Sequence, residues 1–134
     1  MQPAVKTLDH LVLTVSDMDR TIAFYRDILG MTPRKFIPAD GSTRWSLAFG
    51  DQKINLHQAG AEYLPKAKTP SPGSADLCFL SEIPVGDWVA HFARLSIAIE
   101  DGPVARTGAT GPILSVYIRD PDGNLLEISN KSEG

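Results

Sequence analysis

The segment LDHLVLTVSDMDRTIAFYRDILGM, residues 8–31, contains the pattern that decides the fold. Its first part is rich in apolar and β-branched side chains, which predicts a strand over residues 8–15. Ser16 or Asp17 can then cap a helix, apolar residues recur at helical spacing, and Gly30 ends the pattern. The segment therefore predicts a strand and an amphipathic helix whose apolar stripe faces the core.

The segments that follow this helix have the composition of strands, and the whole order of elements then returns. Turn signals at Asp40-Gly41 and Gly50-Asp51 separate predicted strands over residues 32–37, 43–49 and 52–58. The second part of the chain predicts a strand over 75–81, a helix over 85–95 and strands over 96–100, 113–119 and 124–129. The repeat overlays His10 on Asp76 and Asn55 on Glu127 by pattern rather than by identity.

This duplication predicts an α+β fold, a single domain over residues 1–134 that is made of two βαβββ modules. The modules span residues 7–58 and 74–130, and residues 59–73 link them. A lone module leaves one face of its curved mixed sheet uncovered, so two modules are expected to enclose a cavity. The linker, rich in Pro, Gly and Ala, is interpreted as a plain connection, with a lid over the pocket as the alternative.

Composition restricts the classes of partner. Thirteen basic and 16 acidic residues give a net charge of -3 without a basic run, which argues against nucleic acid and anionic membranes. A small-molecule substrate is the expected partner. The single cysteine, Cys78, cannot form an internal disulfide, and the N-terminal residues form no hydrophobic signal segment. These features predict a cytoplasmic protein with no membrane span.

Polar side chains alternate with the apolar rows of the predicted strands and share the face that points away from the helices. They are His10, Asn55, His57, Asp76, Tyr117, Arg119 and Glu127. Glu127 stands among leucine and isoleucine residues, and a carboxylate removed from water needs a cation or several donors. Two explanations stay open: an ion pair between Glu127 and Arg119, or a divalent metal ion that Glu127 holds jointly with His10.

Two other segments bear on the expected pocket. Residues 103–112 are predicted to form a loop whose glycines, threonines and Arg106 can bind an anionic part of a ligand, with a solvated turn as the alternative. Cys78 falls on the expected cavity face, and it is interpreted as a small apolar filler because no base neighbours it in the sequence.

The chain resembles the vicinal oxygen chelate superfamily, which includes glyoxalase I, fosfomycin-resistance proteins, bleomycin-binding proteins and extradiol dioxygenases. The stretches LDHLVLTVSDMDRTIAFYRDILGM, LAFGDQKINLH, PGSADLCFL and GPILSVYIRDPDGNLLEIS carry the resemblance. Within this superfamily, the chain is most similar to glyoxalase-domain proteins that share FGDQKINLH and RTGATGPILSVYIRDPDGNLLEIS. The resemblance implies two modules whose first and last strands supply metal ligands.

Carried over position by position, the resemblance implies that His10 and Glu127 are metal ligands. The chain departs from the family at Asp76, where histidine is usual, and at Asn55, where glyoxalase I has glutamate; His57 lies two residues further on the same face. A divalent metal, Zn, Ni, Mn or Fe, is therefore expected on His10, Asp76 and Glu127, with His57 as fourth ligand or proton carrier.

The implied reaction is glyoxalase I-like: a lyase or isomerase in which Glu127 moves a proton next to a carbonyl, while the metal holds an enediolate. The expected substrate is a small hydroxy-carbonyl compound or hemithioacetal. The residues expected to line its pocket are Trp45, Phe49, Asn55, Arg106, Tyr117 and Arg119.

Two alternatives remain. Iron on His10, His57 and Glu127 would suit a dioxygenase that cleaves catechol-like rings. A cavity without metal would suit a drug-binding protein like the bleomycin-binding relatives, with Trp45, Phe49 and Tyr117 as stacking surfaces. The resemblance also implies a homodimer, since related proteins build their sites from modules of two chains.

Overall fold

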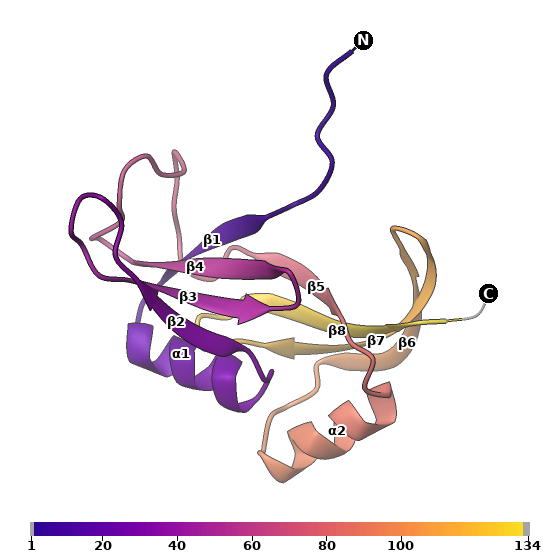
Figure 1. The fold of residues 1–134 in the computed structure, drawn as a ribbon. Helices are drawn as coiled ribbons and strands as arrows, with labels where there is room; N and C mark the ends of the chain where they lie inside the picture. Colours follow the sequence, from indigo (N-terminus) through magenta and orange to yellow (C-terminus); the bar gives the residue numbers. More distant parts are fainter. Residues whose placement is uncertain (1, 133–134) are drawn as a thin grey trace. The chain divides into compact units, whose positions relative to one another are not determined.

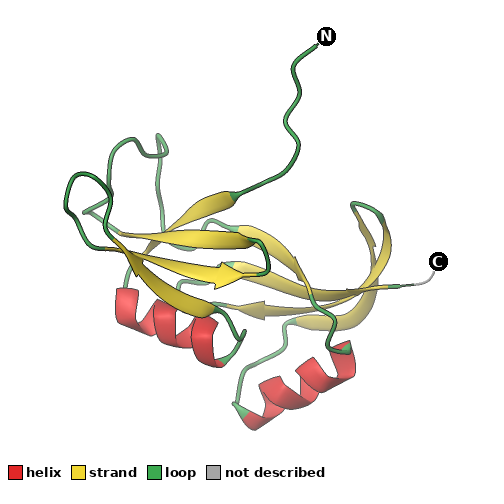
Figure 2. Ribbon diagram, in the orientation of Figure 1, coloured by secondary structure: helices red, strands yellow, loops and turns green. Residues whose placement is uncertain are grey.

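The computed structural model describes residues 2–132, which divide into two compact units between Ser71 and Pro72. This boundary falls within residues 59–73, the predicted linker. Each unit contains one helix and its own four-stranded sheet (Figures 1 and 2). Among the described residues, neither helix has the length and apolar character that crossing a membrane would require.

The first unit has the predicted order of one strand, one helix and three strands. Its elements are β1 (His10–Val15), α1 (Met18–Asp27), β2 (Thr32–Phe36), β3 (Arg44–Phe49) and β4 (Gln52–Gln58). The strands lie in the order β1-β4-β3-β2, with β1 parallel to β4 and the other pairs antiparallel. The helix packs on one face of this sheet, where it contacts β2, β3 and β4.

Asp17 is the residue that starts α1. Its side chain accepts a hydrogen bond from the backbone N–H of Arg20 at 3.0 Å, so Asp17 rather than Ser16 caps the helix. Ile22 and Tyr25 are buried on the inner side of α1, and Leu13 and Leu56 are buried in the strands. The apolar stripe predicted from helical spacing is thus part of the core of this unit.

The second unit repeats the first. Its elements are β5 (Asp76–Leu80), α2 (Val85–Arg94), β6 (Asp101–Gly108), β7 (Gly111–Arg119) and β8 (Leu125–Lys131). The strand order β5-β8-β7-β6 corresponds element by element to that of the first sheet. Pairing also repeats: His10 lies opposite Lys53, and Asp76 lies opposite Leu125. The fold predicted from the duplicated pattern is confirmed.

One part of the predicted second unit is wrong. Residues 97–100 are not a strand, and most of the predicted loop 103–112 belongs to β6 and to the start of β7. The strand β6 lies at the edge of its sheet, where a proline such as Pro103 is tolerated because an outward N–H is not needed for pairing. The register shifts between Asp101 and Val104, which marks an irregularity at Gly102.

Candidate functional site

Each sheet has one face covered by its helix and a second face that we call the open face. Paired residues of neighbouring strands point to the same face, so the register assigns the side chains. In the second unit Glu127 pairs with Cys78 and with Tyr117, whereas the buried Leu126 and Ile128 alternate to the helix side. The predicted placement of Glu127 and Tyr117 opposite the leucine and isoleucine row is confirmed.

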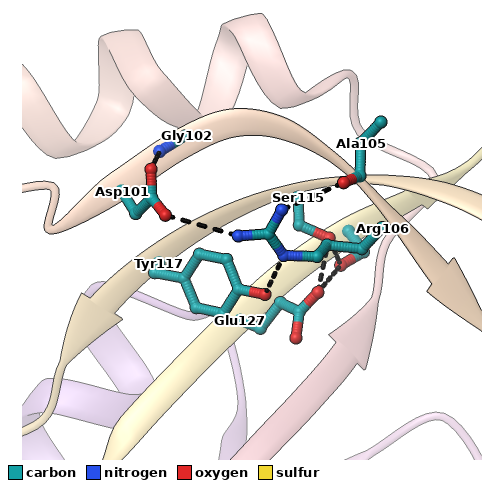
Figure 3. A network of polar contacts seen from close by, with 8 residues as sticks. Asp101, Gly102, Ala105, Arg106, Ser115, Tyr117 and Glu127 are labelled. Atoms are coloured by element: carbon teal, nitrogen blue, oxygen red, sulfur yellow. Dashed lines mark hydrogen bonds and ion pairs between the residues drawn. The ribbon is translucent and has the colours of Figure 1, made fainter.

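The carboxylate of Glu127 is held by serine hydroxyls. Its Oε2 accepts a hydrogen bond from Ser115 Oγ at 2.5 Å, and Ser129 Oγ lies at 3.5 Å (Figure 3). The two serines are fully buried and are 2.7 Å apart. Each hydroxyl satisfies part of the acceptor capacity of the carboxylate, but neither neutralises its charge.

Arg119 does not supply that charge. Its guanidinium forms an ion pair with Glu100, at 2.7 Å from Nη2 to Oε2, and it also donates to the carbonyl of Gly123 at 3.1 Å. Over residues 2–132 no basic side chain forms a salt bridge with Glu127. The proposed ion pair between Glu127 and Arg119 is therefore wrong, and only the metal explanation of the two given above stays open.

Arg106 crosses the open face beside Tyr117. Its Nε donates to the Tyr117 hydroxyl at 3.0 Å, Nη1 donates to the carbonyl of Ala105 at 3.1 Å, and Nη2 lies 3.4 Å from Asp101 (Figure 3). Burial raises the pKa of Tyr117, and the nearby Glu127 raises it further, while the hydrogen bond from Arg106 acts in the opposite direction. The Tyr117 hydroxyl is therefore protonated near pH 7.

Two hollows open on this face of the second unit. One has a volume of about 430 Å³ and is lined by Cys78, Arg106, Tyr117 and Glu127 together with apolar side chains. The other, of about 450 Å³, is lined by Asp76 as well as by Arg106, Tyr117 and Glu127. Two predicted metal ligands of this unit, Asp76 and Glu127, thus border the same hollow.

Cys78 also belongs to this cluster. Its Sγ lies 3.4 Å from Ser129 Oγ, which connects the thiol through the serines to Glu127. Burial raises the pKa of the Cys78 thiol, and the charge of Glu127 adds to the increase, although the hydrogen bond with Ser129 opposes it. The thiol is therefore a poor nucleophile at neutral pH, but Cys78 is exposed, so it is not the buried apolar filler that was predicted.

His10 lies on the open face of the first unit, opposite Lys53 on β4. Its Nδ1 is 2.8 Å from Asp9 Oδ1. Because an ionised carboxylate can only accept, this contact places the proton on Nδ1 and leaves the lone pair of Nε2 for another partner. This is the arrangement that metal-binding histidines commonly have.

His57 is separated from His10 within the same sheet. His57 lies opposite Thr14, and Thr14 is four residues along β1 from His10. At the rise of a strand, the two histidines are therefore about 13 Å apart along the sheet. The His57 ring is buried and makes an edge contact with Tyr63, with ring centroids 5.4 Å apart. Burial, together with the charge of Arg44, lowers the pKa of His57, so it is neutral near pH 7. This separation argues against a single ion on both histidines.

Part of the predicted linker folds over His57. Tyr63 covers the imidazole, Arg44 lies over the Tyr63 ring at 3.8 Å, and the Tyr63 hydroxyl is 3.3 Å from the carbonyl oxygen of Thr43. The neighbouring Glu62 has an almost fully buried side chain whose Oε1 is 3.4 Å from Lys66. Residues 62–63 thus do more than connect, although the sequence offered no periodicity that would indicate it.

Trp45 and Phe49 are corrections to the predicted pocket. Trp45 pairs with the buried Leu56, and Phe49 is four residue pairs further along the same antiparallel ladder, so both side chains point to the helix side of the sheet. Asn55 lies on the open face instead. The alternation of β3 already separates Trp45, Leu47 and Phe49 from Arg44, Ser46 and Ala48, and the two aromatic residues were predicted for their stacking surfaces rather than for their face.

Ser115 and Ser129 were not predicted to belong to the site. Each lies two residues from a predicted site residue on the same strand, Ser115 from Tyr117 and Ser129 from Glu127, so the period of a strand places them on the same face. Small hydroxyl residues at such positions are a weak signal. Their pairing across β7 and β8 is what makes them partners of the carboxylate.

No group of three or more potential metal ligands of the His, Cys, Asp and Glu types comes together in the described part of the chain. The donor set still has the chemistry of a divalent metal site: an imidazole with its second nitrogen already bonded in one unit, and two carboxylates that border one hollow in the other. Nitrogen and oxygen donors of this kind suit Zn, Ni, Mn and Fe. The donor types of each unit therefore suit such a metal ion, and the two sets of donors belong to different units.

A family model for the Glyoxalase/Bleomycin resistance protein/Dioxygenase superfamily matches residues 7–128. The chain is 54% identical over 129 residues to Virulence protein STM3117 of Salmonella typhimurium, covering 96% of this chain and 87% of that protein. It is 53% identical over 129 residues to the glyoxalase domain-containing protein RDO1 of Mycosarcoma maydis, covering 96% of this chain and 70% of the relative.

Several solved structures have the same fold. A protein from the mobile metagenome of V. Pseudocholerae is 49% identical with a TM-score of 0.93, covering 99% of this chain and 100% of that one. A lactoylglutathione lyase from Agrobacterium tumefaciens is 26% identical with a TM-score of 0.70, covering 95% of each chain. TnmS3, an antibiotic binding protein from Streptomyces sp. CB03234, is 22% identical with a TM-score of 0.74, covering 98% of this chain and 100% of that chain, and shares the fold.

Proposed function

The chain belongs to the glyoxalase/bleomycin resistance protein/dioxygenase superfamily, and from this premise we propose that it is a metal-dependent lyase or isomerase of the glyoxalase type. Its substrate would be a small hydroxy-carbonyl compound or hemithioacetal. The lactoylglutathione lyase from Agrobacterium tumefaciens, which is 26% identical, supports this reaction class.

Glu127 is the observation on which the proposal rests. Its carboxylate borders two hollows of the second unit, and its partners are the hydroxyls of Ser115 and Ser129. Within residues 2–132 it has no basic partner in a salt bridge. A carboxylate in such a position is suited to bind a cation or to accept a proton from a substrate.

The proposed ligands are Nε2 of His10 and the carboxylates of Asp76 and Glu127. We do not assign His57 to the same ion, because its distance from His10 along the sheet exceeds what two imidazoles on one ion can span. His57, neutral near pH 7 and in contact with Tyr63, is therefore not given a role in the proposed reaction. A divalent ion would polarise two adjacent oxygens of the substrate and lower the barrier to removal of a neighbouring proton.

The side chains of the second unit would perform the remaining work. Glu127 would take the proton from the carbon next to the carbonyl and return it to the adjacent carbon. Ser115, with its hydrogen bond of 2.5 Å, would keep the carboxylate oriented toward the hollow. The protonated hydroxyl of Tyr117 would offer a hydrogen-bonding group on the same wall.

Metal analysis of untagged protein tests the proposal. We expect stoichiometric divalent metal in the wild type and a loss of at least tenfold in metal affinity in both His10→Ala and Glu127→Ala, since each would remove one of few ligands. His91→Ala, on α2, is the control and should keep its metal. Unchanged metal content in His10→Ala and Glu127→Ala would reject the site.

The identity of the metal and an activity assay separate the related functions. Nickel or zinc together with turnover of a hemithioacetal would support the isomerase. Ferrous iron together with ring cleavage of a catechol would indicate a dioxygenase instead. Absence of stoichiometric metal would favour sequestration of a ligand; TnmS3, which shares the fold, is an antibiotic binding protein.

A further inference from the structure

We infer that the hollow of about 430 Å³ in the second unit recognises a small monocarboxylate, which Arg106 and Lys131 would bind through its charged end. The inference concerns the site of the proposed function and names the chemical class of its substrate. It does not require the metal, because both basic side chains belong to the second unit. The volume of the hollow is within the range of pockets that hold small molecules.

Charge is the first argument. Arg106, Lys131 and Glu127 are the charged residues that line this hollow, so two positive charges accompany one negative charge. Lys131 forms no salt bridge with any other described residue, and the acidic partner of Arg106, Asp101, is 3.4 Å away and exposed. An anionic ligand would therefore meet one cation without an acidic partner among the described residues, Lys131, and one, Arg106, whose acidic partner is exposed to solvent.

The orientation of Arg106 is the second argument. A guanidinium has five N–H donors, and three contacts, with Tyr117, Ala105 and Asp101, leave donors for a ligand. The same contacts hold the planar group in place over the Tyr117 ring, with 5.5 Å between Cζ and the ring centroid (Figure 3). An arginine held in this way loses little side-chain freedom when it binds a carboxylate with two parallel hydrogen bonds.

The shape of the turn between β6 and β7 is the third argument. Gly108 lines the hollow, and a Cβ at this position would lie 2.9 Å from Ile113 Cγ2 and 3.0 Å from the carbonyl oxygen of Gly111. A glycine therefore lets the turn pack closely against β7. Thr107 and Thr110, which flank Gly108 in this turn, add backbone and hydroxyl groups to the same wall.

The remaining lining limits the ligand to one carboxylate. Leu80 and Ile113 make it partly apolar, and Glu127 would repel a second negative charge. A carboxylate on Arg106 and Lys131 would direct the uncharged remainder of the ligand toward Glu127. Short-chain acids that carry a carbonyl and a neighbouring hydroxyl group beyond the carboxylate combine these properties with the hydroxy-carbonyl unit that the proposed reaction needs.

Cys78 offers a direct test, because it is the single cysteine of the chain and it lines the hollow. The rate at which neutral iodoacetamide alkylates Cys78 can be measured at pH 8.5 with increasing pyruvate or propionate, and with their uncharged amides. We expect both carboxylates to slow alkylation in a saturable way and the amides to have no effect. Equal protection by acids and amides would overturn the inference.

Variants test the two basic residues separately. Arg106→Gln and Lys131→Gln should each raise the carboxylate concentration that gives half protection about tenfold, since each removes one charge-assisted contact. Arg94→Gln removes an exposed positive charge from α2 and is the matched control, which should behave like the wild type. Lys131 is exposed, so Lys131→Gln should fold like the wild type. This variant therefore still tests the inference if Arg106→Gln does not fold.

Repeating the measurement with chelator-treated protein separates this inference from the proposed function. Protection that persists without metal and weakens in Lys131→Gln supports carboxylate recognition even if the metal site fails. Protection that requires added metal and is unchanged in Arg106→Gln and Lys131→Gln would show that the ion alone holds the carboxylate, and it would overturn the inference.

Discussion

Two arginines of the second unit show how the partner of a residue determines its role. Arg119 is on β7 and Arg106 is on the neighbouring strand β6. Arg119 forms an ion pair with Glu100, whereas Arg106 donates a hydrogen bond to the Tyr117 hydroxyl at the edge of the hollow. Glu127 is left with serine hydroxyls instead of a guanidinium. Its negative charge can therefore attract a metal ion or a donor group of a ligand, and it also acts on the neighbouring thiol of Cys78.

The thiol of Cys78 yields a prediction at this scale. Burial and the nearby Glu127 raise its pKa, so less thiolate is present at a given pH than in an ordinary cysteine. We expect the pH profile of alkylation by iodoacetamide to have its midpoint above about 8.5, the value of a free thiol. The measurement compares folded protein with the same chain unfolded in urea.

Glu127→Gln serves as the matched variant, because it keeps the size of the side chain and removes the charge. Its midpoint should shift to lower pH than that of the wild type. The midpoint, unlike the absolute rate, does not depend on how easily the reagent reaches the thiol. A folded wild type with the same midpoint as the unfolded chain would contradict this account of Cys78.

The two helices begin in different ways although the modules repeat. The side chain of Asp17, the N-cap residue, caps α1. The N-cap residue of α2 is Pro84, whose side chain cannot accept a hydrogen bond. Asn130 of β8 takes this role: its Oδ1 accepts from the N–H of Val85 at 2.8 Å. Its Nδ2 donates to the carbonyls of Ser81, at 2.9 Å, and Ile83, at 2.8 Å. A strand residue thus holds the start of the helix.

Replacing Asn130 should therefore cost more stability than replacing a local cap. We expect Asn130→Ala to lower the free energy of unfolding by about 2 to 3 kcal/mol, because it removes three hydrogen bonds worth about 1 kcal/mol each. Asp17→Ala should cost about 1 kcal/mol. Urea unfolding followed by circular dichroism measures both. A smaller loss in Asn130→Ala than in Asp17→Ala would refute the role of Asn130.

At the scale of the whole molecule, the proposed ligands are divided between the two units. His10 belongs to the first unit, and Asp76 and Glu127 belong to the second. The proposed site needs both units, either of one chain or of two chains in a homodimer. We propose the homodimer, on the resemblance to proteins that combine modules of two chains.

Mixing two inactive variants distinguishes these arrangements. If each site combines His10 of one chain with Glu127 of its partner, a mixed dimer of His10→Ala and Glu127→Ala has one site with both ligands and one with neither. We therefore expect metal binding to return when the two variants are unfolded together and refolded. Light scattering should give the mass of two chains. A monomer, or no recovery of metal, would contradict sharing between chains.

Local periodicity accounts for most of the fold that was predicted from the sequence. The bounds of β4 were predicted to the residue, and those of β5 to within one residue. The strand β6 was missed because Pro103 and its glycine neighbour have the composition of a loop, and its partner on β7 is needed to make it a strand. Trp45 was misplaced because its aromatic ring, rather than the alternation of β3 with Arg44 and Ser46, decided the prediction.

The sequence by itself determined the duplicated order of elements and the face on which Glu127, Tyr117 and Asp76 lie. These properties depend on neighbours two to four residues apart, which the chain carries locally. Only the tertiary structure decided that Ser115 holds Glu127 and that Arg119 goes to Glu100 instead. Such partners lie on different strands, and the register that brings them together is an outcome of packing the whole sheet on its helix.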